Sequence, residues 1–469
     1  MSQRELFRRG GINFVTKVLG QLLNLAQIPI YVAALLPERY GALNVGYVYL
    51  NFFVIFAVFG LNEALTRFYP SASGEDKKRI VSTALVFSLI WALALFAAHR
   101  LMAAELTIFF FNDPALAPFF TLMLIIAVVE TFNLNITMLY QLEKKSGSYA
   151  RALLGKNGLK LILTALFLLY FRWGVTGAAL ALLAGSLFYL IPALPLLRQR
   201  FTPRLSGKHL KKLLRYGAPF MITSLAMNTL FQIDQIILKF LTGLESVAVY
   251  GMAYKLGAAI QYLNGAFALA WFPWLFSLTA DEARRAIPRT LKNYLLVALP
   301  LAVALTIAAR QILPYFLPGE YSAATDIIPW VIWAYIAYSL SDFLGAGLFI
   351  RLRSQRFSLA ALLAVAVNVG LNFLLIPQYG MIAAAWSTFV SMALLTLVSH
   401  LLSRRGFPVS YANLGIVSAT LSFLAIGALS LITAPAGLPP WLYAALLLLL
   451  LALNAYRLGM TRALQNLFR

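Results

Sequence analysis

The sequence predicts an all-α polytopic membrane protein with about fourteen transmembrane helices. Two observations carry this prediction. The 469 residues are 61% hydrophobic and only 12% charged, with a mean hydropathy of +0.80, which leaves too little polar surface for a soluble domain. The apolar residues also occur in blocks of about 20, the length that spans a bilayer core. Lipid offers no hydrogen-bond partners to the backbone, so we expect each block to be a helix.

The apolar blocks follow one another with short loops, and no loop is long enough to hold a folded extramembrane domain. The fourteen expected spans are residues 12–35, 42–69, 79–99, 115–140, 150–171, 174–197, 212–240, 246–277, 290–309, 325–350, 356–376, 380–402, 411–433 and 438–457. The first span has no small-residue cleavage pattern, so we interpret it as an uncleaved helix rather than a signal peptide.

Basic residues gather in alternate loops, which predicts the orientation of the chain. The sparsely basic set of loops carries only Arg39, Arg100, Arg172, Lys239 and Arg310. Loops on the cytoplasmic side of a membrane carry the excess of lysine and arginine. We therefore expect the heavily basic loops and both termini to be cytoplasmic. The net charge of +22 then reflects topology, and we expect no nucleic-acid partner.

The two halves of the chain share motifs at a constant offset of 206 residues. The pattern R-x-G-x-x-F begins at Arg9 and at Arg215, and G-x-x-x-A-A begins at Gly174 and at Gly380. Six spans per half preserve orientation, which predicts parallel repeats related by an axis along the membrane normal. The expected parts are an N-terminal lobe at 1–197, a basic cytoplasmic linker at 198–211, a C-terminal lobe at 212–402, and two additional helices with a cytoplasmic tail at 411–469.

Charged residues inside the expected spans are the candidates for function, because each one costs about 2.5–3.5 kcal/mol on insertion. A basic, water-filled cavity between the lobes is predicted to bind the phosphate or acidic sugar of an anionic substrate. The candidate ligands of that anion are Lys17, Arg67, Lys255, Lys156 and Lys160. Lysines near a span end also snorkel to the interface, which is an equal interpretation for Lys17 and Lys156.

Acidic and uncharged polar residues supply the remaining candidates. The acids can pair with lysines across helices or bind a coupling proton or sodium ion, and they are Glu63, Glu130, Asp234 and Asp342. Glu63 is also spaced to pair with Arg67 on one helical face. The residues suited to binding a sugar are Asn24, Gln27, Tyr47, Gln232 and Tyr254. Helices in lipid also use such groups to hydrogen-bond one another.

Enzymatic chemistry has little support in the sequence. It contains no phosphate-binding loop, no G-x-S-x-G and no H-E-x-x-H. The absence of cysteine excludes disulfides, cysteine-ligated zinc and cysteine nucleophiles. A membrane polymerase or ligase normally needs sizeable external loops, and those expected here are short. We therefore predict no catalytic residues, no metal site and no cofactor.

Several stretches resemble the multidrug/oligosaccharidyl-lipid/polysaccharide (MOP) flippase superfamily, in particular its polysaccharide-exporter branch of Wzx-like O-antigen and exopolysaccharide flippases. They are Pro37-Glu38-Arg39-Tyr40-Gly41, residues 59–70 (FGLNEALTRFYP), Tyr216-Gly217-Ala218-Pro219, residues 249–254 (VYGMAY) and residues 371–380 (LNFLLIPQYG). The resemblance implies two six-helix lobes in a V and alternating access. It also implies a polyprenyl-(pyro)phosphate-linked oligosaccharide as substrate, and a cavity lined by helices that carry Lys17, Arg67 and Lys255.

The resemblance implies further expectations about location and partners. They are a monomer located in a bacterial or archaeal cytoplasmic (inner) membrane. The expected partners are the surrounding lipids and polysaccharide-assembly proteins. Two related functions stay open as alternatives. A cation-coupled multidrug exporter usually has twelve spans and acidic cation sites, whereas Lys17 places a base in the first span here. A peptidoglycan lipid-precursor flippase also fits fourteen spans.

Overall fold

The computed structural model describes residues 3–202, 205–351, 354–411, 425–426 and 439–457, and helices account for nearly all of them. They form two compact units, Met1–Ala248 and Val249–Arg469, and the division falls within α12. The helices of the first unit are α1 (Gln3–Leu25), α2 (Ile28–Ala34), α3 (Pro37–Val58), α4 (Leu61–Phe68), α5 (Gly74–Leu101), α6 (Ala103–Phe111), α7 (Ala117–Leu142), α8 (Ser146–Ala165), α9 (Gly174–Phe188), α10 (Leu194–Arg200), α11 (Gly207–Thr242) and the start of α12 (Leu244–Gly257).

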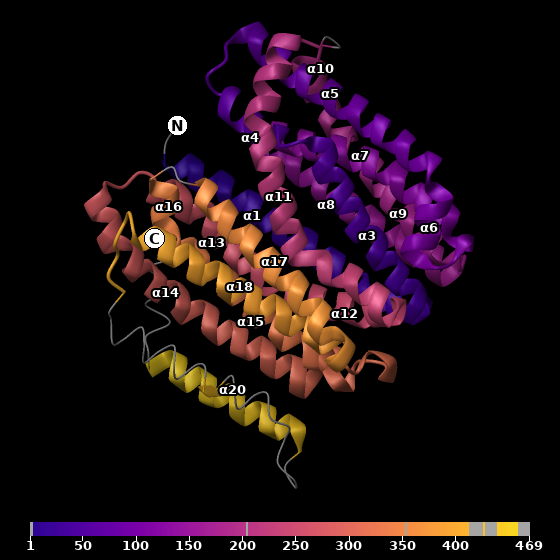
Figure 1. Cartoon of the computed structure of the whole chain (residues 1–469), viewed down its shortest axis with the longest axis vertical. Helices are drawn as coiled ribbons and strands as arrows, with labels where there is room; N and C mark the ends of the chain where they lie inside the picture. The colour runs from indigo at the N-terminus through magenta and orange to yellow at the C-terminus, as the bar shows by residue number, and fades with distance from the viewer. Residues whose placement is uncertain (1–2, 203–204, 352–353, 412–424, 427–438, 458–469) are drawn as a thin grey trace. The chain divides into compact units, whose positions relative to one another are not determined.

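The first unit is a bundle of long apolar helices, visible in indigo to magenta in Figure 1. Helices α3, α5 and α9 pack against α7, α1 packs against α8, and α11 packs against α3, α4 and α5. One end of the bundle is closed by the buried rings of Tyr140, Tyr149 and Tyr189, whose centroids lie 6.2–6.5 Å apart around Tyr140. Aromatic burial of this kind contributes a large share of the packing energy of the helices.

Five of the predicted spans are broken into two helices each, where the sequence had predicted a single helix. Span 12–35 is divided between α1 and α2 because Pro29 lies in the first turn of α2, where its ring and missing N–H interrupt a continuing helix. Span 42–69 is divided between α3 and α4 by Phe59 and Gly60, which have left-handed φ values of 54° and 68°. Span 246–277 is divided between α12 and α13 (Ile260–Leu275) at Ala258 and Ala259. Span 174–197 is divided between α9 and α10, and span 325–350 between α15 (Ala324–Leu344) and α16 (Ala346–Ile350).

Gly60 also allows the backbones of α4 and α11 to touch. A Cβ atom at Gly60 would lie 2.1 Å from the carbonyl oxygen of Gly217, and one at Gly217 would lie 2.7 Å from that of Gly60. Such distances are far inside van der Waals contact, so only glycine fits at this crossing. Small residues permit the same close approach between helices in other membrane proteins.

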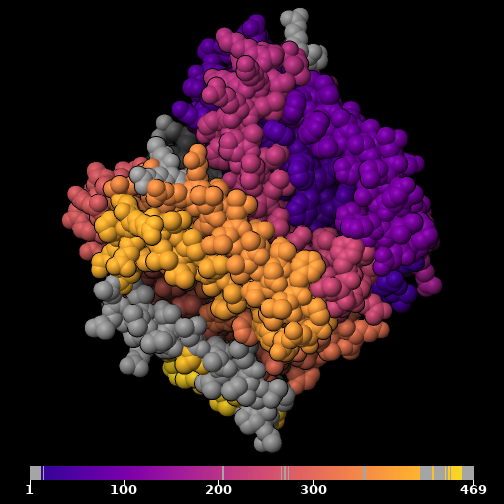
Figure 2. Space-filling model, viewed as in Figure 1, coloured from indigo at the N-terminus to yellow at the C-terminus, as the bar shows by residue number. Residues whose placement is uncertain are grey.

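The second unit contains a layer of roughly antiparallel helices, shown in orange in Figure 1. Its helices, with α12 and α13, are α14 (Ala280–Ile307), α15 (Ala324–Leu344), α16 (Ala346–Ile350), α17 (Ser354–Tyr379), α18 (Met381–Arg404) and α20 (Pro440–Arg457). Helix α18 packs against both α15 and α17, and α14 packs against α15 and α20. Residues 354–404 form a continuous surface in Figure 2. That segment exposes large apolar side chains such as Leu359, Phe373 and Leu397, as expected for a surface in lipid.

Ten helical segments of the described residues are long and apolar enough to cross a membrane. The structure thus confirms an all-α, multi-pass membrane protein. The predicted span 411–433 lies almost entirely outside the described residues, and the predicted count of fourteen and the two six-helix lobes stay predictions. The repeat-matched glycines do share a local geometry, because Gly174 and Gly380 directly precede or begin a helix with φ values of 57° and 63°.

Candidate functional site

A buried ion pair joins α7 to α8 inside the first unit. The Lys156 ammonium lies 2.5 Å from the carboxylate of Glu130, and both side chains are less than a fifth exposed. The same carboxylate accepts hydrogen bonds from the Ser186 hydroxyl of α9 and, at 3.4 Å, from the Asn133 amide. A buried charge pair is tolerated when its hydrogen-bonding capacity is met in this way. The arrangement corresponds to the pairing interpretation of Glu130.

Lys160 lies one helical turn beyond Lys156 and has a different environment. It is 8% exposed, and no carboxylate among the described residues forms an ion pair with it. Its ammonium lies 5.3 Å from the centroid of the Tyr47 ring on α3, a weak cation–π contact. Glu130, Lys156 and Lys160 together therefore carry one surplus positive charge. A buried cation of this kind is energetically costly unless an anion binds beside it.

A strip of polar side chains runs along α1 and α2 beside this cation. Lys17, Gln21 and Asn24 recur at the spacing of one helix face, and Lys17 is exposed. The Asn24 amide donates to Gln21 at 3.4 Å, the Gln27 amide donates to Asn24 at 3.3 Å, and the Tyr31 hydroxyl donates to Gln27 at 2.8 Å.

The strip is attached to α8 and reaches the buried lysine. Tyr31 neighbours Tyr47 and Lys160. The Asn157 amide of α8 donates to the backbone oxygen of Gly20 at 3.0 Å. The structure therefore brings together five of the predicted site residues in one unit, namely Asn24, Gln27, Tyr47, Lys156 and Lys160. The break between α1 and α2 lies within this strip. Broken helices also occur at the binding sites of other transporters.

The second unit holds a separate set of predicted residues. The Tyr335 hydroxyl donates to that of Tyr254 at 3.2 Å, and Lys255 lies half-buried in the last turn of α12. Asp342 of α15 neighbours the rings of Tyr294 and Tyr338. No lysine, arginine or histidine among the described residues forms an ion pair with Asp342. A half-buried carboxylate without a cationic partner among the described residues is a candidate to take up a proton or a sodium ion.

The remaining predicted residues lie elsewhere in the first unit. Arg67 is exposed and Glu63 half-buried on α4, and neither forms an ion pair with a described residue. Gln232 of α11 donates to Asn228 and accepts a hydrogen bond of 3.0 Å from Asn51 of α3. Asp234 is buried, and its carboxylate accepts a 2.9 Å bond from the backbone N–H of Gln235.

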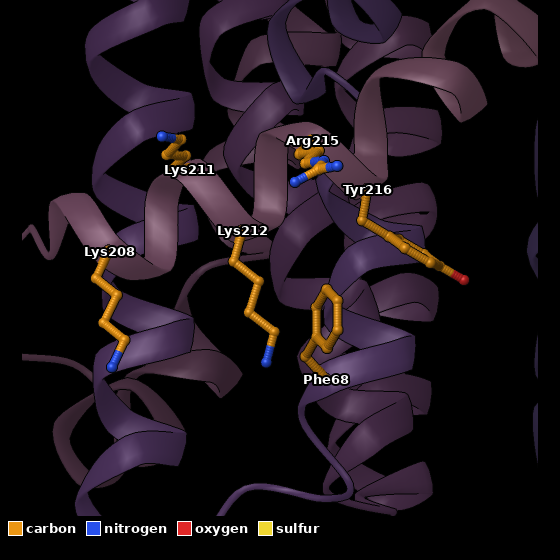
Figure 3. Close-up of a pocket in the computed structure, with 6 residues that line it drawn as sticks. All are labelled: Phe68, Lys208, Lys211, Lys212, Arg215 and Tyr216. Atoms are coloured by element: carbon orange, nitrogen blue, oxygen red, sulfur yellow. The ribbon is translucent and has the colours of Figure 1, made fainter.

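The structure also contains a basic pocket that the sequence analysis treated only as a topological signal. This pocket, of about 500 Å³, lies where α11 begins and α4 ends, and Figure 3 shows the side chains around it. It is called the basic pocket below. The residues that line it are Phe68, Lys208, Lys211, Lys212, Arg215 and Tyr216. The spacing of its four cations, at i, i+3, i+4 and i+7, is the signal that predicts one helix face.

Comparisons with known proteins agree with this architecture. The sequence profile of the family described as "Polysaccharide biosynthesis protein" matches residues 6–279. A curated relative, "Probable flippase AglR" of Haloferax volcanii, is 26% identical over 226 residues, which cover 46% of this chain and 46% of the relative. The match therefore spans about half the length of that protein.

Two solved structures share the fold. One is the lipid II flippase MurJ in an inward closed conformation, with a TM-score of 0.75 and 17% identity over 98% of this chain and 99% of the other. Another is an inward-facing multidrug resistance MATE family transporter of the MOP superfamily, with a TM-score of 0.64 and 20% identity over 82% and 94%. The profile covers more than half of the chain. The chain therefore belongs to the polysaccharide biosynthesis protein family.

Proposed function

We propose that this protein is a flippase that moves a polyprenyl-(pyro)phosphate-linked oligosaccharide from the cytoplasmic to the outer leaflet by alternating access. The observation that carries the proposal is the buried Lys160, which has no carboxylate partner among the described residues and lies beside a strip of amide and phenol groups. A phosphate would neutralise this lysine, and the amides and phenols would hydrogen-bond the glycan. The name of the curated relative, "Probable flippase AglR", supports a transport role, and the family's description supports a polysaccharide as the substrate class.

The substrate fits this site in parts. The diphosphate would lie against Lys160. Lys17, at the N-terminal end of the polar strip, would add a second cation. The sugars would contact Asn24, Gln27 and Tyr47, and the polyprenyl chain would stay in lipid. Movement between leaflets requires that the substrate or a cation bind the two access states with different affinity.

The two alternatives differ from this proposal in the substrate that would be moved. A multidrug exporter carries cationic compounds, and the surplus positive charge of Glu130, Lys156 and Lys160 disfavours them. A peptidoglycan precursor is itself a polyprenyl-diphosphate glycan, so the same site would serve it. The likeness to the lipid II flippase concerns the fold, and only the accumulated glycan can separate this alternative from a surface polysaccharide unit.

Coupling to a cation belongs to the second unit in this proposal. Asp342 is the candidate carboxylate of the second unit and has no cationic partner among the described residues, whereas Glu130 of the first unit pairs with Lys156. Binding of a proton or sodium ion to the half-buried Asp342 would favour one access state if the cation binds that state more tightly. Both termini would lie on the cytoplasmic side in the same scheme, as the basic loops predict.

The leaflet sidedness of lipid-linked oligosaccharide in cells that lack this protein tests the function. We expect intact carrier-linked units to accumulate facing the cytoplasm, and wild-type protein to relieve the accumulation. Lys160→Met protein should not relieve it, whereas Lys145→Gln, at an exposed loop position of the same unit, should. Normal sidedness with unpolymerised units accumulating outside would instead place the protein after translocation and contradict the proposal. The structure of the accumulated glycan separates a peptidoglycan precursor from another polysaccharide unit.

A further inference from the structure

The basic pocket gathers positive charge that the buried site does not use. Four cations line it, and no carboxylate is among its lining residues. All four side chains are exposed. The acidic neighbour Asp76 lies 4.0 Å from His209 and is not one of the residues that line the pocket. Its volume of about 500 Å³ lies in the range of small-ligand sites, about 300–1,000 Å³.

We propose that the basic pocket is the loading site for the diphosphate headgroup of the lipid-linked substrate at the cytoplasmic leaflet. The inference rests on the proposed flippase function and adds a second, outer binding step to it. The basic loops predict that α11 begins on the cytoplasmic side, where such a lipid is made available. Two phosphates present several anionic oxygens, and four lysine and arginine groups on one helix face can neutralise them together.

The same face of α11 continues from cations to apolar residues, which matches the chemistry of an amphiphile. Lys208, Lys212 and Arg215 are followed at helical spacing by Pro219 and Ile222. Pro219 is exposed, and Ile222 is 51% exposed. A lipid lying along this face would place its phosphates on the cations and the first isoprene units on the apolar residues. A soluble anion would use only the first half of the face.

An aromatic contact holds one of the cations in position, and all four cations lie on helix α11 rather than on a loop. The Lys212 ammonium lies 4.2 Å from the centroid of the Phe68 ring, and that ring packs edge-on against Tyr216 at 5.2 Å. Figure 3 shows Lys208 and Lys212 extending in the same direction from α11, with Phe68 beside Lys212. The glycine crossing of Gly60 and Gly217 fixes α4 against α11 close to this point. A positioned cation loses less conformational entropy on binding than a mobile one.

The test uses the full-length protein in nanodiscs of zwitterionic lipid, with a short-chain polyprenyl diphosphate as probe. Binding is measured in the Lys160→Met background, so that the buried cation does not contribute. Lys208→Gln/Lys212→Gln should weaken binding about tenfold or more, which corresponds to the loss of about 1.4 kcal/mol. The matched control Lys145→Gln/Arg151→Gln removes the same charge from two exposed positions, one just before α8 and one in its second turn, and should change binding less than twofold. Lys208→Arg/Lys212→Arg should bind like the parent.

Transport separates this loading role from the buried site. In an otherwise wild-type chain, Lys208→Gln/Lys212→Gln should raise the apparent KM for lipid-linked substrate and leave the maximal rate near wild type. Equal binding by the pocket and control variants would overturn the inference. So would competition by phosphatidylglycerol as strong as that by polyprenyl diphosphate, because the pocket would then be a general site for anionic lipids. If wild-type protein fails to translocate any lipid-linked glycan, the proposed function fails, whatever the pocket binds.

Discussion

Lys156 and Glu130 form a 2.5 Å ion pair between α8 and α7, and this pair leaves Lys160, one turn along α8, as a buried cation without an acidic partner among the described residues. In the proposed function these two lysines of one helix face have different roles. Lys156 would stabilise the fold by neutralising Glu130, whereas Lys160 would bind an anion. The predictions below separate these roles.

The first prediction concerns the ion pair. Lys156→Met should lower the free energy of unfolding by about 3–5 kcal/mol, because it leaves the buried carboxylate of Glu130 without its cation. Glu130→Gln should destabilise in the same way through Lys156. The double variant Lys156→Met/Glu130→Gln should be more stable than either single variant, since it buries no lone charge. Thermal unfolding of the purified proteins in one detergent gives all three values. Additive losses in the double variant would show that the two side chains are not coupled.

The second prediction concerns Lys160, for which the expected change in stability has the opposite sign. Lys160→Met should leave the thermal unfolding temperature unchanged or raise it, because it removes a buried charge that no described carboxylate compensates. Comparison with Lys156→Met, the same change one turn away, controls for the loss of a lysine from α8. A large destabilisation by Lys160→Met would mean that this ammonium is needed for the fold, and it would remove the main argument for an anion site.

The third prediction concerns the glycine crossing. Gly60→Ala should destabilise the protein by about 2–5 kcal/mol, because a left-handed φ disfavours alanine and the new Cβ would meet the backbone of Gly217. Gly158→Ala is the matched control, since a Cβ at that position of α8 has no neighbour within 4 Å. It should be neutral or stabilising by up to about 1 kcal/mol. Thermal unfolding compares the two, and equal stability would disprove close contact at Gly60.

The fourth prediction concerns coupling. Asp342→Asn keeps the shape of the side chain but removes the charge that a coupling cation needs. Translocation by this variant in proteoliposomes should no longer respond to an imposed proton or sodium gradient, while unstimulated translocation should persist. Glu130→Gln/Lys156→Met is the comparison, and it should keep its response. A gradient response that survives Asp342→Asn would move the coupling site elsewhere.

The sequence predicted the membrane class and most helix positions, because apolar blocks and alternating basic loops are local properties. It did not predict the break between α3 and α4, which has a left-handed backbone at Phe59 and Gly60 and at which Gly60 touches a helix that lies far away in sequence. The R-x-G-x-x-F motif at Arg215 was interpreted as a repeat. Its Gly217 is also a contact residue in the structure.

The sequence predicted which residues make up the candidate site, but not which of them form an ion pair. Lys156 and Lys160 were equal candidates, because their four-residue spacing places them on the same helix face. Only the fold shows that Glu130 of α7 meets the first and not the second. The basic pocket was missed for a different reason. Its lysines have an obvious topological role at the membrane surface, and the partner ring of Phe68 lies about 140 residues away in the chain.

Translocation by purified protein in proteoliposomes tests the central claim most directly. A polyprenyl-diphosphate-linked oligosaccharide would be incorporated into the bilayer, and the fraction exposed on each leaflet would be measured over time by an impermeant sugar-modifying reagent. We expect wild-type protein and the Lys145→Gln control to move the lipid between leaflets, and folded Lys160→Met protein to move it no faster than protein-free liposomes. Wild-type rates in the Lys160→Met protein would contradict the assignment of the anion site, and no movement with wild-type protein would contradict the flippase function itself.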